Sequence, residues 1–407
     1  MDSPQTLITD LPSMSSLTNW DRILISTFQQ LQGGKLSLCF ADGTRIVVGK
    51  GNGDFADMTF HKQGLSKEML LGGSMGLAES YMNGAWSTSD LSALLRVLAR
   101  SQKQMGLMAR GTSHVLKKMD RLMHRLRSNT KENALKNIQE HYDLSNEMYE
   151  TFLDPSLTYS AAIFEEEGEA LEQAQVRKID RLIKQLNPRP GDHVLEIGSG
   201  WGACAIRLAQ GTGCKVTSLT LSERQAEEGR KRVVAAGVED LVEIRIQDYR
   251  DVEGQFDHVI SIEMIEAVGH EFLPEYFEVV NARLKPGGRF ALQAITIPDG
   301  RYEEYNRSVD FIRKHIFPGG HLPSPSLLEG LCEEKTSLHK IDELEFGKDY
   351  AETLRRWGKN FSDRIEEVKS LGFDDVFIRK WQYYFCYCEA GFDTDLIHVR
   401  QICYQKG

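Results

Sequence analysis

The stretch His193-Val-Leu-Glu-Ile-Gly-Ser-Gly-Trp-Gly202 decides the fold of this chain. Its apolar residues Val194, Leu195 and Ile197 predict a short buried strand, and the alternate glycines predict a tight turn after it. Residues 203–209 then carry apolar side chains at helical spacing. A strand, a glycine-rich turn and a helix form the nucleotide-binding element of a doubly wound α/β sheet. Glycine lets a ligand approach the backbone, and the helix start offers free N–H groups.

The acidic residues around this element indicate its ligand. The glycines from Gly198 also fit the dinucleotide fingerprint, but that interpretation needs an acid at the end of the second strand. The second predicted strand, residues 216–221, has no acid before Glu223. Glu196 instead lies inside the first strand, where a buried carboxylate needs a cationic or hydrogen-bonding partner. The amino group and sulfonium of S-adenosylmethionine would suit it, so this cofactor is favoured. NAD, or a glycine turn without a ligand, are the alternatives.

Length and composition predict two domains. The chain has 407 residues, of which 41% are hydrophobic, enough for ordinary cores. It has no apolar run of 18 residues, and its N-terminus carries an acid and lacks a signal sequence, so a cytoplasmic protein is expected. The seven cysteines are too scattered for a disulfide framework, and Cys386-Tyr-Cys388 has no matching pair for a metal.

Positive charge is concentrated in one segment. Residues 100–127 hold eight Lys or Arg and one Asp, a local charge of +7, whereas the whole chain carries −10 and the remainder therefore −17. The acidic remainder argues against a nucleic-acid partner. Residues 98–126 are also amphipathic, which fits a linker helix docked on the core. An interfacial helix on an anionic membrane or, more remotely, a calmodulin-type target are the alternatives.

The chain is predicted to have four parts. They are a flexible N-terminus (1–20), a small α/β domain (21–96), a basic amphipathic helical linker (97–133) and a catalytic domain (134–407). In the small domain, residues 36–40 and 45–48 predict a hairpin, and residues 72–86 predict a helix that ends before an exposed Trp86. It contains no acid–base or metal cluster, so we interpret it as a docking module.

The catalytic domain alternates predicted strands and helices, which indicates a mostly parallel sheet. Asp248 and Tyr249 follow the third strand, where a nucleobase would lie, and Glu263 and Glu266 end the fourth, a usual place for chemistry. The predicted strands are 193–198, 215–221, 242–247, 256–263, 288–297, about 338–346, and 398–405.

A long insertion, residues 299–325, follows the fifth strand and is a natural lid. His315 and His321 within it have a spacing that matches no metal site. No metal is therefore predicted.

Taken together, these stretches resemble the cyclopropane-fatty-acyl-phospholipid synthase family, most closely its plant-like branch. The resemblance covers nearly the whole chain, and its motifs occur in one order, which makes them specific. They include Ala78-Glu-Ser-Tyr-Met-Asn-Gly84, His141-Tyr-Asp-Leu-Ser-Asn146, Leu157-Thr-Tyr-Ser160, Gln247-Asp-Tyr-Arg250, Glu263-Met-Ile-Glu-Ala-Val-Gly-His-Glu271, Ile316-Phe-Pro-Gly-Gly320 and Thr353-Leu-Arg-Arg-Trp357.

The resemblance implies a class I methyltransferase, with a Rossmann-like doubly wound sheet behind a small α/β lipid-docking domain. The implied reaction adds a methyl(ene) group from S-adenosylmethionine to the double bond of an unsaturated phospholipid acyl chain. Peripheral association with an anionic membrane and a homodimer are further expectations. The implied cofactor-binding residues are Tyr159, Ser160, Glu196, Gly198, Gly200, Gly202, Thr220, Leu221, Gln225, Asp248, Tyr249 and Arg250. The implied catalytic residues are Glu266, Gln293 and Tyr159.

The chain departs from the family at one place. The family holds a bicarbonate ion, its general base, with a Cys, a His, a Tyr and the active-site Glu. Here the Cys position is Ala161, the His position is Gln293, and the Tyr position aligns with Gly358. Bicarbonate is therefore a doubtful cofactor. A cyclopropane is the leading expected product, with a methyl-branched or methylene chain, or a non-catalytic S-adenosylmethionine-binding subunit, as the alternatives.

Overall fold

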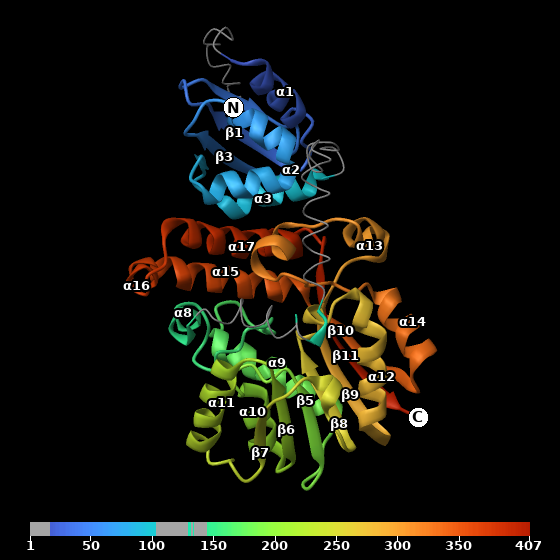
Figure 1. The fold of residues 1–407 in the computed structure, drawn as a ribbon. Helices are drawn as coiled ribbons and strands as arrows, with labels where there is room; N and C mark the ends of the chain where they lie inside the picture. Colours follow the sequence, from blue (N-terminus) through green and yellow to red (C-terminus); the bar gives the residue numbers. More distant parts are fainter. Residues whose placement is uncertain (1–16, 103–128, 132, 134–144) are drawn as a thin grey trace, which may run out of the picture. The chain divides into compact units, whose positions relative to one another are not determined.

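The computed structural model describes residues 17–102, 129–131, 133 and 145–407, and the chain divides into two compact units, residues 1–113 and 114–407 (Figure 1). Most of the predicted flexible N-terminus and of the predicted basic linker lies outside the described residues. The first helix begins at Asn19, within the segment predicted to be flexible.

Over its described residues, 17–102, unit 1 is a four-stranded sheet with three helices. The predicted hairpin is confirmed, since β1 and β2 pair antiparallel, and β3 then lies parallel to β1. The predicted exposure of Trp86 is wrong, because its ring is buried and its Nε1 donates to the carbonyl of Leu77 (3.1 Å). The sheet order is β2-β1-β3-β4, with bounds β1 Gly34–Cys39, β2 Arg45–Val48, β3 Asp54–Phe60 and β4 Trp86–Ser87. The helices are α1 Asn19–Phe28, α2 Leu65–Met82 and α3 Leu91–Arg100.

Unit 2 contains a seven-stranded mixed sheet. All seven strands lie where the sequence predicts them, and only β11, which pairs antiparallel with both neighbours, departs from the parallel pattern. The order is β10-β11-β9-β8-β5-β6-β7. The bounds are β5 His193–Ile197, β6 Lys215–Thr220, β7 Val242–Ile246, β8 Phe256–Ile262, β9 Leu284–Thr296, β10 Leu338–Glu345 and β11 His398–Lys406.

Two hydrophobic cores cover the two faces of this sheet. Successive side chains of a strand alternate between faces, so Val194 packs in one core while Leu195 and Ile197 pack in the other. The core around Val194 contains residues of α9, α10 and α11, and the other contains residues of α12 and α14 (Figure 1). The helix bounds are α9 Leu171–Leu186, α10 Ala203–Thr212, α11 Glu223–Ala235, α12 Leu273–Arg283 and α14 Pro325–Lys335.

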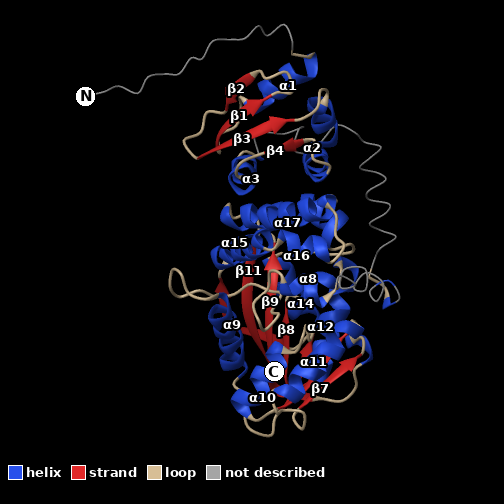
Figure 2. Ribbon diagram, turned by 90° about the vertical axis from the view of Figure 1, so that its left-hand side faces the viewer, coloured by secondary structure: helices blue, strands red, loops and turns tan. Residues whose placement is uncertain are grey.

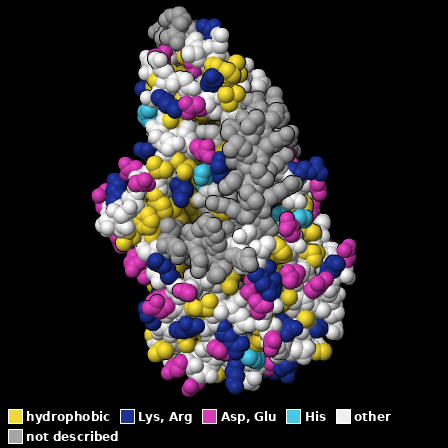
Figure 3. All heavy atoms as spheres, viewed as in Figure 1, with side chains coloured by type: hydrophobic (Ala, Val, Ile, Leu, Met, Phe, Trp, Pro, Cys, Tyr) yellow, Lys and Arg dark blue, Asp and Glu magenta, His cyan; other side chains and the backbone are white. Residues whose placement is uncertain are grey.

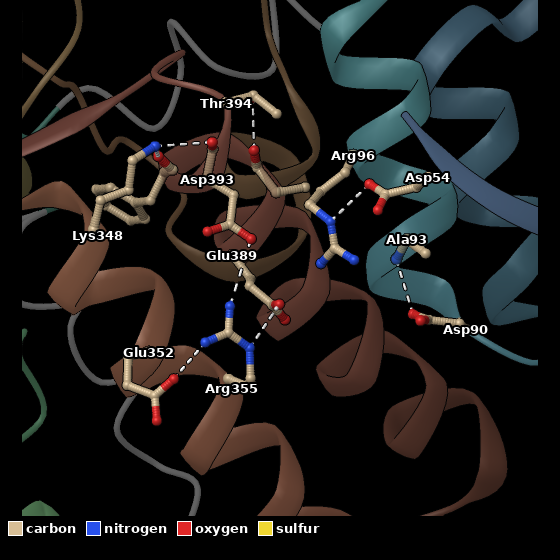
Figure 4. A network of polar contacts seen from close by, with 12 residues as sticks. Asp54, Asp90, Ala93, Arg96, Lys348, Glu352, Arg355, Glu389, Asp393 and Thr394 are labelled. Carbon is tan, nitrogen blue, oxygen red and sulfur yellow. Dashed lines mark hydrogen bonds and ion pairs between the residues drawn. The ribbon is translucent and has the colours of Figure 1, made fainter. Parts of the chain in front are cut away.

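Helices α15 (Gly347–Asp363) and α17 (Asp375–Asp393), joined through α16 (Ile365–Ser370), lie beyond the carboxyl ends of β8 and β9 (Figure 2). Buried aromatic side chains fill the space between them. Arg355 of α15 also donates to Glu389 (3.2 Å) and Asp393 (3.5 Å) of α17 (Figure 4). The helix pair is therefore fixed both by packing and by charge.

The predicted lid contains α13 (Asp299–Asn306) and the π-helical turn η4 (Ile312–Ile316). Buried Arg313 donates to the carbonyls of Ser308 (2.8 Å) and Gly320 (3.1 Å), which closes the segment on itself. The remaining short helices are α8 Asn146–Glu150, η1 Tyr249–Asp251, η2 Ile265–Ala267 and η3 His270–Phe272.

The surface and composition of the described part add three observations. No described helix combines the length and apolarity that a membrane crossing needs. Within the same residues, no group of three potential metal ligands comes together. On the described surface of unit 2 in Figure 3, side chains of both charge signs are interspersed.

Candidate active site

One pocket gathers the predicted cofactor-binding residues at the carboxyl ends of β5, β6, β7 and β8. Every one of them except Gly202 forms part of its wall. The wall also contains residues that the prediction did not include, among them Asn129, Lys178 and Glu263. The predicted catalytic residues Glu266 and Gln293 lie outside this wall, next to Glu263.

The glycine turn leaves room for a ligand at one position. Gly200 has φ +48°, and a Cβ built on it would meet no atom within 4 Å. Gly202 instead lies against α11, where a Cβ would meet Gly229 Cα at 3.6 Å. Gly200 therefore allows the close approach of a ligand, whereas Gly202 allows the turn to pack on a helix.

Glu196 is a buried carboxylate at the bottom of the pocket. It is 2% exposed and accepts a hydrogen bond from Ser218 Oγ, and burial raises its pKa to about 7. A cationic group bound next to it would favour its ionised form. The pocket therefore fits a ligand that carries an amino group or sulfonium, as the sequence predicts for S-adenosylmethionine.

Lys178 of α9 is a buried cation that sequence reasoning missed. Its side chain is fully buried, its Nζ lies 2.6 Å from Ser160 Oγ, and burial lowers its pKa to about 8. The charges of Glu263 and Glu196 act in the opposite direction and favour the ammonium form. A lysine within an amphipathic helix gives no sequence signal of this kind, since most such lysines face solvent.

The opposite end of the pocket is built by polar side chains after β6 and β7. Thr220 Oγ1 donates to Gln225 Oε1 (2.9 Å), and Asp248 and Arg250 form an ion pair (2.7 Å). Burial acts to raise the pKa of Asp248, but the hydrogen bonds and charge of Arg250 outweigh it, so this pKa is lowered. These are the residues that the resemblance assigns to the ribose and the adenine, and that assignment stays a prediction.

Glu263 occupies a cradle of three hydrogen-bond donors. Its Oε1 accepts from the backbone N–H of Ala161 (2.8 Å) and from Gln293 Nε2 (2.7 Å), and its Oε2 accepts from the hydroxyl of Tyr350 (2.8 Å). Its backbone is left-handed, with φ +48°, a conformation that costs about 1–2 kcal/mol for a residue other than glycine. Burial raises the pKa of Glu263, against the charge of Lys178 and the three donors.

The tyrosine of this cradle stands at another position than the one aligned with the family. The position aligned with Gly358 faces Phe385 and contributes nothing to the cradle; Tyr350, two turns earlier on α15, supplies the hydroxyl. Ala161 donates through its backbone, so the missing cysteine side chain removes no donor. Two of the positions implied for bicarbonate, Ala161 and Gln293, together with Tyr350, therefore surround a carboxylate that belongs to the chain itself.

Glu266 lies three residues after Glu263 and has fewer hydrogen-bond donors. Its Oε1 accepts from the backbone N–H of Ile295 (2.5 Å), and its buried Oε2 has no hydrogen-bond partner among the residues that the structure describes. Burial, and then the nearby charge of Glu263, raise the pKa of Glu266 to about 8. Glu266 is therefore largely protonated at pH 7, whereas the donors around Glu263 suit an ionised carboxylate.

Aromatic rings surround Tyr159, the third predicted catalytic residue. Its hydroxyl donates to that of Tyr384 (2.9 Å), and its ring lies 5.3 Å from Trp357 and 5.5 Å from Tyr149, centroid to centroid. These rings come from α8, α15, α17 and the segment before α9, and they make the region beside the pocket dry and rich in π-electrons. Such a setting can stabilise a cation.

Comparison with known proteins gives consistent matches. The family model described as mycolic acid cyclopropane synthetase matches residues 129–402. Tuberculostearic acid methyltransferase UfaA1 of Mycobacterium tuberculosis is 39% identical over 385 residues, 90% of this chain and 86% of the relative. The cyclopropane-fatty-acyl-phospholipid synthase of Escherichia coli is 32% identical over 355 residues, 86% and 88% of the two chains. A solved structure of mycolic acid cyclopropane synthase CmaA1 complexed with SAH and CTAB matches with a TM-score of 0.63 and 28% identity, over 67% of this chain and 98% of that one.

Proposed function

The chain belongs to the mycolic acid cyclopropane synthetase family of S-adenosylmethionine-dependent methyltransferases, and we propose that it methylates the double bond of an unsaturated acyl chain with Glu263 as the general base. One observation carries the proposal. The carboxylate of Glu263 occupies the three-donor cradle of Ala161, Gln293 and Tyr350, and the first two are positions where the family resemblance implies a bound bicarbonate.

The pocket residues would hold the cofactor and keep water out. When bound, S-adenosylmethionine supplies an electrophilic methyl group. An isolated alkene is a weak nucleophile, and its methylation leaves positive charge on the acyl chain. The aromatic rings around Tyr159 would stabilise that charge, and the buried surroundings would protect it from water.

The two glutamates would then have separate tasks. A C–H proton of the cationic acyl chain passes to the ionised carboxylate of Glu263, and its bonding electrons neutralise the chain. Glu266, with a pKa of about 8, would stay neutral at pH 7 and could not compete for the proton. The charge of Lys178 and three donors act to favour the ionised form of Glu263, whereas burial and the charge of Glu263 act against that of Glu266; such differences in environment are a common way to divide acid and base roles.

We propose an unsaturated methyl-branched or methylene chain as the product. The base is a tethered side chain in place of a free anion, so the proton it reaches need not be the one whose loss closes a ring. The tuberculostearic acid methyltransferase also matches this chain at higher identity, and over a larger share of this chain, than the Escherichia coli cyclopropane synthase. A cyclopropane is the second candidate, because Glu263 takes the position implied for the base of ring closure.

The substrate pool is part of the proposal. We propose acyl chains of membrane phospholipids, reached through the basic segment 100–127, whose positive charge fits an anionic surface. That segment lies mainly outside the described residues, so its sequence alone supports this step.

Mass spectrometry with methyl-trideuterated S-adenosylmethionine and an unsaturated phospholipid tests the function. A branched internal alkene retains three deuteriums and takes up hydrogen on mild hydrogenation. A methylene chain retains two and also takes up hydrogen, whereas a cyclopropane retains two and does not. The first two results support the proposal, the third supports the second candidate, and no incorporation would contradict both.

A further inference from the structure

Two buried glutamines link Glu263 to a guanidinium on helix α9, which packs on the face of the sheet that their side chains share. We propose that Arg181, Gln401 and Gln293 form a polar relay that positions the carboxylate of Glu263 and favours its ionised form. This inference rests on the proposed role of Glu263 as base. It assigns Arg181 and Gln401 as positioning residues, since neither touches the pocket.

The relay follows the sheet. Gln401 of β11 is the direct cross-strand partner of Gln293 of β9, and both side chains are fully buried. Arg181 Nη1 donates to Gln401 Oε1 (2.9 Å), Gln401 Nε2 donates to Gln293 Oε1 (2.9 Å), and Gln293 Nε2 donates to Glu263 Oε1 (2.7 Å). Three hydrogen bonds thus join α9 to the base.

The chemistry of the two ends fixes the direction of every bond. A guanidinium has only donors, so the carbonyl oxygen of Gln401 must face Arg181. Its amino group then faces Gln293 Oε1 and the carbonyl of Lys178 (3.1 Å). The amino group of Gln293 in turn faces Glu263 and the carbonyl of Ala161 (3.2 Å). Each amide group thus uses both of its N–H donors and its carbonyl oxygen, so flipping either amide would lose hydrogen bonds.

The last member of the relay must accept, which favours the carboxylate form of Glu263. A protonated Glu263 could not accept as strongly at the oxygen nearest Gln293. Lys178 acts in the same direction through its charge, and Tyr350 through its hydroxyl. Glu266 faces the same region, and burial keeps it neutral at pH 7. On the outer side, Arg181 is held by Asp342 (2.7 Å).

The test measures the pH dependence of turnover in purified variants. Gln401→Leu removes the central amide, which frees Gln293 to present its carbonyl oxygen to Glu263. We expect the rise of kcat with pH to occur about one pH unit higher than in the parent chain. At pH values below that rise, turnover should fall about tenfold. Cofactor affinity, measured by calorimetry, should stay unchanged. Gln405→Leu is the control, because Gln405 lies on the same strand and, among the described residues, its side chain bonds only the carbonyl of Gly287.

Two further variants keep the result decisive. Arg181→Leu changes a partly exposed side chain, and we expect a smaller shift of the pH profile in the same direction. If Gln401→Leu does not fold, the pH profile of Arg181→Leu tests the relay in its place. Glu263→Gln separates the two proposals. If it stays fully active, the proposed base is wrong and the relay with it. If it is inactive while Gln401→Leu and Arg181→Leu keep the parental pH profile, only the relay is overturned.

Discussion

The backbone nitrogen of Ala161 donates to Glu263 Oε1 across 2.8 Å. A backbone N–H can donate whatever side chain its residue carries, so alanine can occupy position 161 without loss of this hydrogen bond. The left-handed backbone of Glu263, with φ +48°, directs its carboxylate into the same cradle. A residue other than glycine in this conformation carries strain, which points to a function for its side chain.

Gly200→Val should abolish binding of S-adenosylmethionine. The added side chain would enter the open space beside the glycine turn, where no protein atom lies within 4 Å. Gly237→Val is the control for backbone strain, because Gly237 also has a positive φ (+66°) and open surroundings. Calorimetry should detect binding in the control variant alone. Equal binding by both variants would contradict the assignment of the pocket.

Affinity for S-adenosylmethionine should rise with pH up to neutrality. The pKa of Glu196 is about 7 without a ligand, and a cationic group beside it favours the carboxylate. Affinity should therefore increase up to about tenfold per pH unit below 7 and level off above it. Titrations from pH 5.5 to 8.5 test this, and Glu196→Gln should remove the dependence. A flat profile in the parent chain would show that Glu196 does not sense the ligand.

Glu266→Gln should be far less harmful than Glu263→Gln. Glutamine mimics the neutral carboxyl that Glu266 carries at pH 7, so turnover should stay within about tenfold of the parent, against a loss of 10²-fold or more at Glu263. Folding raises the pKa of Glu266 to about 8, so this group ionises more readily in the unfolded chain. Its effect on the free energy of unfolding therefore becomes increasingly destabilising as pH rises from about 4.5 to 8. Glu266→Gln should thus raise Tm most above pH 8. A Tm gain confined to pH 5 would contradict this.

Binding to lipid vesicles should need anionic lipid and weaken with salt, because screening shortens electrostatic attraction to about 8 Å at physiological ionic strength. Reversing the charges of Lys117, Lys118 and Arg121 to glutamate should reduce sedimentation with anionic vesicles. Equal binding to neutral vesicles would return residues 98–126 to the linker interpretation.

Much of the sheet and cofactor pocket was predictable because both depend on local pattern. The local sequence of residues 193–202 encodes a strand followed by a glycine turn. The parallel arrangement of the strands then brings Glu196, Thr220 and Asp248 to one edge of the sheet. Comparison with known proteins confirms the predicted cofactor, S-adenosylmethionine, and the fold class. The roles of individual residues in that pocket remain predictions.

The cradle was not predictable, because its members are far apart in sequence. Glu263 was recognised as an acid at a strand end, but nothing in its neighbours indicates a left-handed backbone or a contact with Tyr350, 87 residues later. Alignment by motif placed the tyrosine at Gly358, two turns away on the same helix. The cross-strand pairing of Gln293 and Gln401 likewise depends on a register that no local pattern encodes.

The most direct test of Glu263 as the built-in base is Glu263→Gly with added bicarbonate. Glycine adopts the left-handed backbone without strain and leaves the donors of Ala161, Gln293 and Tyr350 facing an empty cradle. Methyl transfer should fall by 10²-fold or more in bicarbonate-free buffer and recover with millimolar bicarbonate, whereas Glu263→Gln, which still fills the cradle, should not recover. Full activity of Glu263→Gly without bicarbonate would contradict the assignment of Glu263 as the base.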